Sequence, residues 1–134
     1  MEISRILITY AVSIPVFFAI DMVWLGVIAK NFYRKSLESL LTPNVNWTAA
    51  LIFYFIFLAG ILIFALIPGI EKKSLAYTVK MAAVFGFIAY ATYDLTNLAT
   101  LRDWPLMISI VDMCWGAFLS ASTAAITYMI MKLI

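Results

Sequence analysis

Four apolar runs, each long enough to cross a lipid bilayer, occupy most of this 134-residue chain. A membrane-spanning helix needs about 20 mainly apolar residues. The runs extend over residues 6–29, 47–67, 75–101 and 105–131. Pro15 is an expected kink in the first run, and Pro68-Gly69 is the expected end of the second. Because hydrophobic residues make up 66% of the chain and charged residues 12%, we predict an all-α integral membrane protein: one domain, a four-helix bundle with both termini on the same side.

The longest connection between the runs, over residues 30–46, begins with the amphipathic segment NFYRKSLESLL. On a helix over residues 31–41 the apolar side chains fall on one face and the charged ones largely on the other: Phe32, Leu37, Leu40 and Leu41 against Arg34, Lys35 and Glu38. This pattern is typical of a helix that lies in the headgroup layer of a membrane. An ordinary polar loop that ends in a Pro43-Asn44 turn explains the same residues equally well.

Several classes of function are excluded by the residues that the chain lacks. Histidine is absent, and Cys114 is the single cysteine. Catalytic triads with histidine, zinc sites of histidine and cysteine, and intrachain disulfides are therefore excluded. The net charge of +2 comes from scattered cations rather than a basic block, so we expect no nucleic-acid partner. These cations divide almost equally between the two ends of the bundle, so the positive-inside rule does not fix the orientation. Cytoplasmic termini are our working expectation.

Three aspartates lie inside the apolar runs, and all three are expected at the same depth. Asp21 is eight residues before Ala29, Asp94 is eight before Arg102, and Asp112 is seven after Pro105. Since a helix rises about 1.5 Å per residue, each aspartate lies roughly 10 to 12 Å below the end of the bundle opposite the termini. The three carboxyl groups should therefore share one layer.

Polar and aromatic side chains accompany each aspartate at helical spacing. Residues three and four positions apart stack on one face of a helix. Trp24 follows Asp21, Tyr90 and Asn97 flank Asp94, and Trp115 follows Asp112. The candidate pocket residues are Asp21, Asp94, Asp112, Tyr90, Tyr93, Asn97, Trp24, Trp115 and Arg102, the last of these if its side chain reaches inward.

Carboxylates buried in a membrane need hydrogen-bond donors, protons or cations as partners. An aspartate in hydrocarbon costs about 2.5 to 3.5 kcal/mol on insertion scales. Neighbouring carboxylates also favour protonation of one another, so we expect the cluster to hold a proton or a bound cation, and Asp21, Asp94 and Asp112 are candidate metal ligands. The alternative is structural, because polar side chains often hold membrane helices together, with couplings that average about 0.6 kcal/mol.

The sequence Asp-Met-x-Trp occurs twice, as DMVW from Asp21 and DMCW from Asp112. We interpret it as local convergence on an acid with an indole one turn away, rather than as a duplicated unit. The aromatic residues of the second run, including Phe53 and Tyr54, are expected to pack or to face lipid. The small pairs Ala82/Gly86 and Gly116/Ser120 are expected to be close helix contacts.

The runs YATYDLTNLATLRDWP, IDMVWLG, FYRKSLESLL and VDMCWG together resemble a bacterial membrane family, domain of unknown function twenty-one seventy-seven. The similarity covers nearly the whole chain. It implies a small, multi-pass, four-helix protein of the bacterial inner membrane, and it implies no catalytic role.

Three functions compete. The first is binding or transport of a proton, cation or small solute through the aspartate pocket, where transport would need a homodimer because four helices are few for a complete path. The second is an accessory subunit of a larger membrane assembly, in which the acids only fix the packing. The third is a metal-dependent enzyme acting on a lipid or isoprenoid, with the carboxylates around Mg²⁺. The sequence has no dense acidic motif for such an enzyme, so we place it last.

Overall fold

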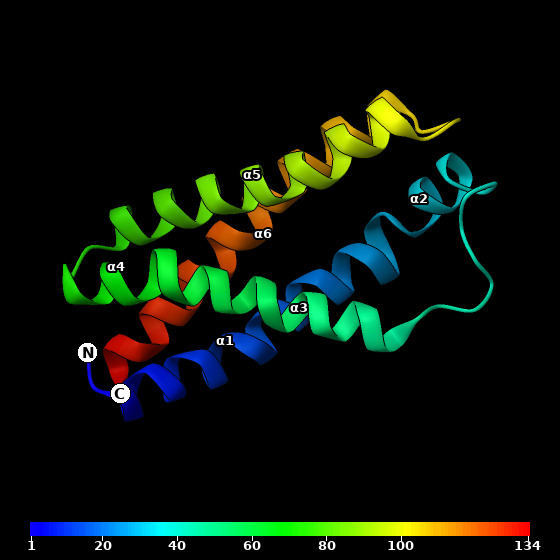
Figure 1. Ribbon diagram of the computed structural model, residues 1–134. Coiled ribbons are helices and arrows are strands. Elements are labelled where there is room, and N and C mark those ends of the chain that lie inside the picture. Colours follow the sequence, from blue (N-terminus) through cyan, green and yellow to red (C-terminus); the bar gives the residue numbers. More distant parts are fainter.

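The structure, a computed structural model, describes residues 1–134 and consists of helices without strands (Figure 1). The helices are α1 (Ile3–Val23), α2 (Lys30–Ser36), α3 (Trp47–Ile61), α4 (Ile67–Glu71), α5 (Leu75–Thr100) and α6 (Leu106–Leu133), with π-helical turns η1 (Trp24–Ile28) after α1 and η2 (Leu62–Leu66) after α3. Four continuous helical stretches are long and apolar enough to cross a membrane: Ile3–Ile28, Trp47–Glu71, Leu75–Thr100 and Leu106–Leu133. The predicted all-α membrane class is confirmed.

The two chain termini lie together at one end of the bundle, and α2 lies at the other (Figure 1). The Arg5 guanidinium donates a hydrogen bond to the backbone carbonyl of Met131 at 3.0 Å. The N-terminal amino group forms an ion pair with Glu71 at 2.8 Å. These contacts join the N-terminal segment, α1, α4 and α6 at the end that holds the termini.

The α5 and α6 helices share the most extensive contact in the bundle; they lie together at the end opposite the termini and diverge toward the end that holds the termini (Figure 1). Gly86 and Gly116 make this approach possible. A Cβ atom at Gly86 would collide with the Gly116 carbonyl oxygen and with the Ser120 side chain, and one at Gly116 would collide with the Tyr90 ring. Small residues at helix interfaces let the backbones come this near.

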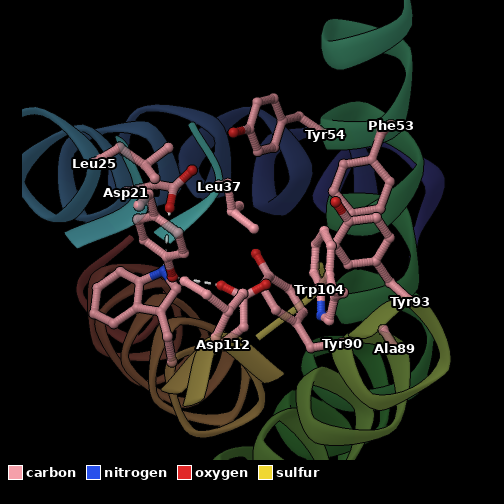
Figure 2. Close-up of a pocket in the computed structure, with 13 residues that line it drawn as sticks. Asp21, Leu25, Leu37, Phe53, Tyr54, Ala89, Tyr90, Tyr93, Trp104 and Asp112 are labelled. Carbon is pink, nitrogen blue, oxygen red and sulfur yellow. Dashed lines mark hydrogen bonds between the residues drawn. The ribbon is translucent and has the colours of Figure 1, made fainter. Parts of the chain in front are cut away.

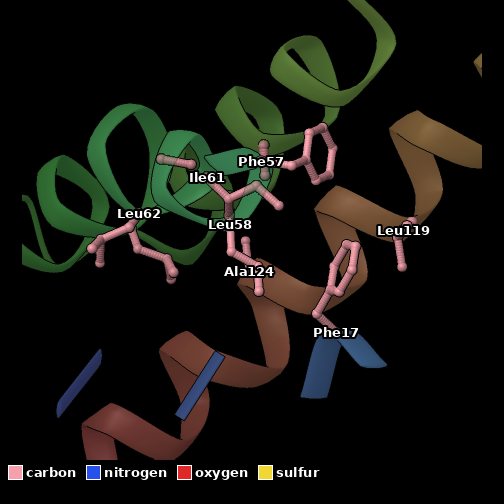
Figure 3. Packing of buried hydrophobic residues seen from close by; sticks show 10 residues of the cluster. Phe17, Phe57, Leu58, Ile61, Leu62, Leu119 and Ala124 are labelled. Atoms are coloured by element: carbon pink, nitrogen blue, oxygen red, sulfur yellow. The ribbon is translucent and has the colours of Figure 1, made fainter. Parts of the chain in front are cut away.

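The apolar core fills the middle of the bundle, where α1, the α3–η2 stretch, α5 and α6 meet (Figure 3). Its buried members are Phe17, Phe57, Leu58, Ile61, Leu62, Ala65, Leu66, Ala82, Leu119 and Ala124. The outer surface instead carries many exposed apolar side chains, among them Val27, Ile56 and Phe118. An apolar exterior of this kind suits a lipid environment.

The second spanning helix continues four residues beyond Ile67, the residue where the sequence suggested that it ends, and reaches Glu71. Pro68 has no N–H and its ring conflicts with the carbonyl four residues earlier in a regular α-helix. Here the π-helical turn η2 comes directly before it, and Ile67 donates to the carbonyl of Leu62, five residues back. This wider turn is one of the ways in which a helix accommodates proline.

The connection over residues 30–46 contains a short helix, α2, which ends at Ser36, earlier than the sequence suggested. Leu37 follows it and is buried, whereas Leu40 and Leu41 are exposed. The expected apolar face is therefore divided: Leu37 packs inward over the bundle end, and the other two leucines do not.

Candidate functional site

The three membrane aspartates lie at the end of the bundle opposite the termini. Asp21 is 2% exposed and Asp94 is 0% exposed. Asp112 is only half-buried, so the expectation of three buried acids is correct for two of them.

A pocket of about 390 Å³ lies among all four spanning stretches, beneath α2 (Figure 2). Its lining is Asp21, Leu25, Tyr33, Leu37, Phe53, Tyr54, Ala89, Tyr90, Tyr93, Trp104, Ile108, Asp112 and Trp115. Figure 2 shows that Asp21, Asp112, Tyr54 and Tyr90 turn their oxygen atoms toward the middle of the space. The pocket is thus an aromatic chamber with two acids.

Asp21 belongs to the last turns of α1 and is held by a residue of α6. The Trp115 indole N–H donates to its Oδ1 at 3.2 Å. Its Oδ2 is buried and has no hydrogen-bond partner in the protein. The Tyr54 hydroxyl of α3 lies beside this carboxyl group. One oxygen of Asp21 is therefore fixed, and the other is available to a ligand.

Asp112 is held from above by α2. The Tyr33 hydroxyl donates to Asp112 Oδ1 at 2.5 Å and accepts from the Trp24 indole N–H at 3.2 Å. Burial raises the pKa of Tyr33, and its bond to the Asp112 carboxylate raises it further. The hydroxyl thus keeps its proton near neutral pH and remains a donor to Asp112.

In the two Asp-Met-x-Trp motifs, the Trp of each motif supports the Asp of the other. Trp115 of the second motif holds Asp21 of the first, and Trp24 of the first holds Asp112 of the second through Tyr33. The two indoles stack, with ring centroids 4.3 Å apart and an interplanar angle of 10°. This arrangement fixes the relative position of α1 and α6 at the depth of the two carboxyl groups.

Asp94 lies behind the pocket wall, between α5 and α6. Ser109 donates to the Asp94 backbone carbonyl at 3.0 Å and itself accepts from the Trp104 indole. Neither carboxyl oxygen of Asp94 has a hydrogen-bond partner in the protein. The nearest ionisable neighbour is the Asp112 carboxyl group. The shared layer therefore contains an Asp94–Asp112 pair and, on the other side of the pocket, Asp21.

Four of the nine predicted pocket residues do not line the pocket: Asp94, Trp24, Asn97 and Arg102. The Trp24 indole N–H donates to the Tyr33 hydroxyl, which itself lines the pocket. Asn97 is half-buried on α5. Arg102 is exposed and forms no ion pair with any acid, so the expectation that its side chain could reach inward is wrong. The α5 helix ends at Thr100, and the turn that follows it carries Arg102 toward the surface.

The expected three-carboxylate metal site is not formed. The chain has no group of three or more histidine, cysteine or acidic side chains that could hold a metal ion. Asp21 and Asp112 face the pocket, whereas Asp94 stands outside its lining. Equal depth in the bundle does not by itself bring three carboxyl groups together, because each side chain must also point toward the same space.

Sequence reasoning missed two of the polar groups in the pocket. Tyr54 is expected from the sequence to pack or to face lipid, and the sequence gives Tyr33 no role beyond its place in the amphipathic segment over residues 31–41. Tyr54 is seven residues after Trp47, so the count of about 1.5 Å per residue would have placed it in the aspartate layer. Tyr33 gave no comparable signal, because its position depends on how α2 folds back over the bundle.

The chamber suits a ligand that is positive at one end and apolar elsewhere. Carboxylates attract the charge, and the faces of aromatic rings attract cations within about 6 Å. The aromatic lining residues are Tyr33, Phe53, Tyr54, Tyr90, Tyr93, Trp104 and Trp115. The volume falls within the range of about 300–1,000 Å³ that is typical of small-molecule pockets.

A family model described as a predicted membrane protein (DUF2177) matches residues 6–129 of the chain. This is the family that the sequence motifs resemble. No curated protein and no solved structure matches the chain.

Proposed function

The chain belongs to the DUF2177 family of predicted membrane proteins, and from its pocket we propose that it binds or transports a small organic cation with an apolar body. One observation carries this proposal. Two carboxyl groups, Asp21 and Asp112, face the same aromatic pocket and neither has a lysine or arginine partner.

Electrostatics supports a positively charged ligand. The single ion pair of the protein, between Met1 and Glu71, lies at the opposite end of the bundle. Anions within a membrane span cost about 2.5–3.5 kcal/mol each unless they are paired. A ligand cation between Asp21 and Asp112 would offset this cost, and the buried Asp21 Oδ2 without a partner would gain one.

The exposure of the pocket wall supports entry from the bilayer. Phe53 of α3 is 49% exposed and Tyr93 of α5 is 56% exposed, although both line the pocket. Figure 2 shows both rings on the side of the pocket that α3 and α5 form. An amphiphilic cation dissolved in the membrane could therefore enter between α3 and α5, with its apolar body against these rings.

The bacterial inner membrane is the proposed location, on the basis of the family resemblance. Cytoplasmic chain termini are proposed with it. Arg5, Lys73 and Lys132 line a second cavity at the end that holds the termini, but Lys30, Arg34, Lys35 and Arg102 lie at the opposite end, so charge alone does not decide the orientation. With cytoplasmic termini, the aspartate pocket would open in the outer leaflet.

A comparison of a cation with its neutral isostere tests the binding proposal. Benzyltrimethylammonium carries a fixed positive charge, and neopentylbenzene has the same shape without it. We expect saturable binding of the cation to the purified protein in nanodiscs, followed through tryptophan fluorescence because Trp104 and Trp115 line the pocket. The neutral compound should bind at least about tenfold more weakly, since it lacks the attraction to the carboxylates and ring faces. Equal affinity for the two compounds would contradict the proposal.

A further inference from the structure

Asp94 is the one ionisable group near the pocket that the proposed binding of a cation does not use. Its side chain is 0% exposed, and both of its carboxyl oxygens lack a hydrogen-bond partner. A carboxylate sealed in this way loses the free energy of hydration and receives no donor in return. The protein must therefore neutralise it in some other way.

The groups that face Asp94 come from three helices and include no cation. Asp112 reaches it from α6, Tyr33 lies nearby on α2, and Tyr93 is its neighbour on α5. The Tyr33 hydroxyl already donates to Asp112, and the Ser109 hydroxyl already donates to the backbone of Asp94. No donor remains for the Asp94 carboxyl group except a proton of its own.

A proton between Asp94 and Asp112 satisfies both carboxyl groups. Protonated Asp94 can donate to the neighbouring Asp112 carboxylate, which is the usual state of two close carboxyl groups in a dry site. Asp112 stands in the pocket wall, whereas Asp94 stands behind it. A charge that arrives in the pocket therefore acts on the same pair that holds the proton.

We propose that binding of an organic cation in the pocket is coupled to release of the proton that Asp94 and Asp112 share. This inference rests on the proposed binding function and specifies how the site is regulated. The charges balance: the pair carries one negative charge with the proton, and the ligand together with the fully ionised pair also carries one. The proton leaves to water as the cation arrives, so the membrane-embedded layer keeps its net charge. The protein thus has the site of a cation–proton exchanger.

Calorimetry measures this exchange directly. Benzyltrimethylammonium is titrated into the protein in nanodiscs at pH 7, in phosphate and in Tris, two buffers whose enthalpies of protonation differ. We expect the observed binding enthalpy to depend on the buffer with a slope that approaches one proton released per ligand bound. The affinity should rise with pH by up to tenfold per pH unit while the pair still holds its proton. The ligand carries a permanent charge, so its own titration cannot produce this dependence.

Asp94→Asn is the matched variant. The asparagine amide can donate to Asp112 permanently, and residue 94 does not line the pocket. We expect the variant to bind the cation with no buffer dependence and with an affinity that is independent of pH.

The outcomes separate this inference from the function on which it rests. Cation binding by the native chain with no proton released at any pH between 5 and 9 would overturn the coupling and leave the binding function intact. Proton release that persists in a folded Asp94→Asn protein would also overturn it. Absence of binding would overturn both proposals, and the native-chain titration decides the matter even if the variant does not fold.

Discussion

Replacement of Asp21 by asparagine is expected to weaken binding of benzyltrimethylammonium by roughly 30-fold or more. Loss of one partner from a buried charge interaction costs about 2–5 kcal/mol, and each 1.4 kcal/mol is a factor of ten. The Asp21 Oδ2 is buried without a protein partner. An amide NH₂ in its place would direct partial positive charge at the ligand instead of negative charge. The change in Kd, measured by the tryptophan fluorescence titration, reports the effect.

A matched variant shows whether the loss depends on position. Asp103 is exposed, lies in the turn between α5 and α6, and has a left-handed backbone (φ 60°) that asparagine also tolerates well. Asp103→Asn removes the same charge and should leave the Kd within about twofold. Asp21→Asn can still accept the Trp115 hydrogen bond, so its fold should be kept. A Kd in Asp21→Asn equal to that in Asp103→Asn would rule out a role for Asp21 in the pocket.

Substitution of Gly86 by alanine is expected to destabilise the bundle more than the same substitution at any other glycine of the chain. The new Cβ would collide with the backbone oxygen of Gly116, which cannot move without a shift of α6. Overpacking of this kind costs typically about 1–3 kcal/mol and occasionally more. The free energy of unfolding, measured by titration with a denaturing detergent, should fall by that amount or the protein should fail to assemble.

Gly26→Ala provides the comparison. A Cβ at Gly26 meets nothing within 4 Å. The same change there should leave the unfolding free energy unaltered or raise it slightly, because alanine favours helix by about 0.5–1 kcal/mol over glycine. Equal stability of the two variants would show that α5 and α6 do not approach as closely as described.

Sequence reasoning found the layer of the site because it needs only helix rise and residue counts. The three aspartates were placed at one end of the bundle, and Asp21 and Asp112 do face one pocket there. The stacking of Trp24 on Trp115 was not predicted. Each of these Trp residues lies one turn from the Asp of its own motif, but because α1 and α6 pack antiparallel, the Trp115 indole donates to Asp21 of the other helix and the Trp24 indole donates to Tyr33.

The parts that were missed depend on long-range packing. Tyr33 reaches Asp112 from 79 residues away, and no local pattern encodes how a connection folds back. Arg102 was expected in the pocket only if its side chain reached inward from just beyond the helix predicted over residues 75–101. The helix ends at Thr100, and Arg102 lies exposed in the turn that follows. Side-chain direction likewise separated Asp94 from the pocket that Asp112 lines.

The most direct test of a cation site between Asp21 and Asp112 is the position of a heavy atom on the ligand. Crystals grown from a lipid mesophase with 4-bromobenzyl-trimethylammonium would give an anomalous peak for bromine. We predict one dominant peak inside the pocket, among the rings of Phe53, Tyr90 and Tyr93, with the ammonium group on the side of the two carboxyl groups. A peak on the lipid-facing surface, or a bromine oriented toward the carboxyl groups with the ammonium directed away from them, would contradict this account.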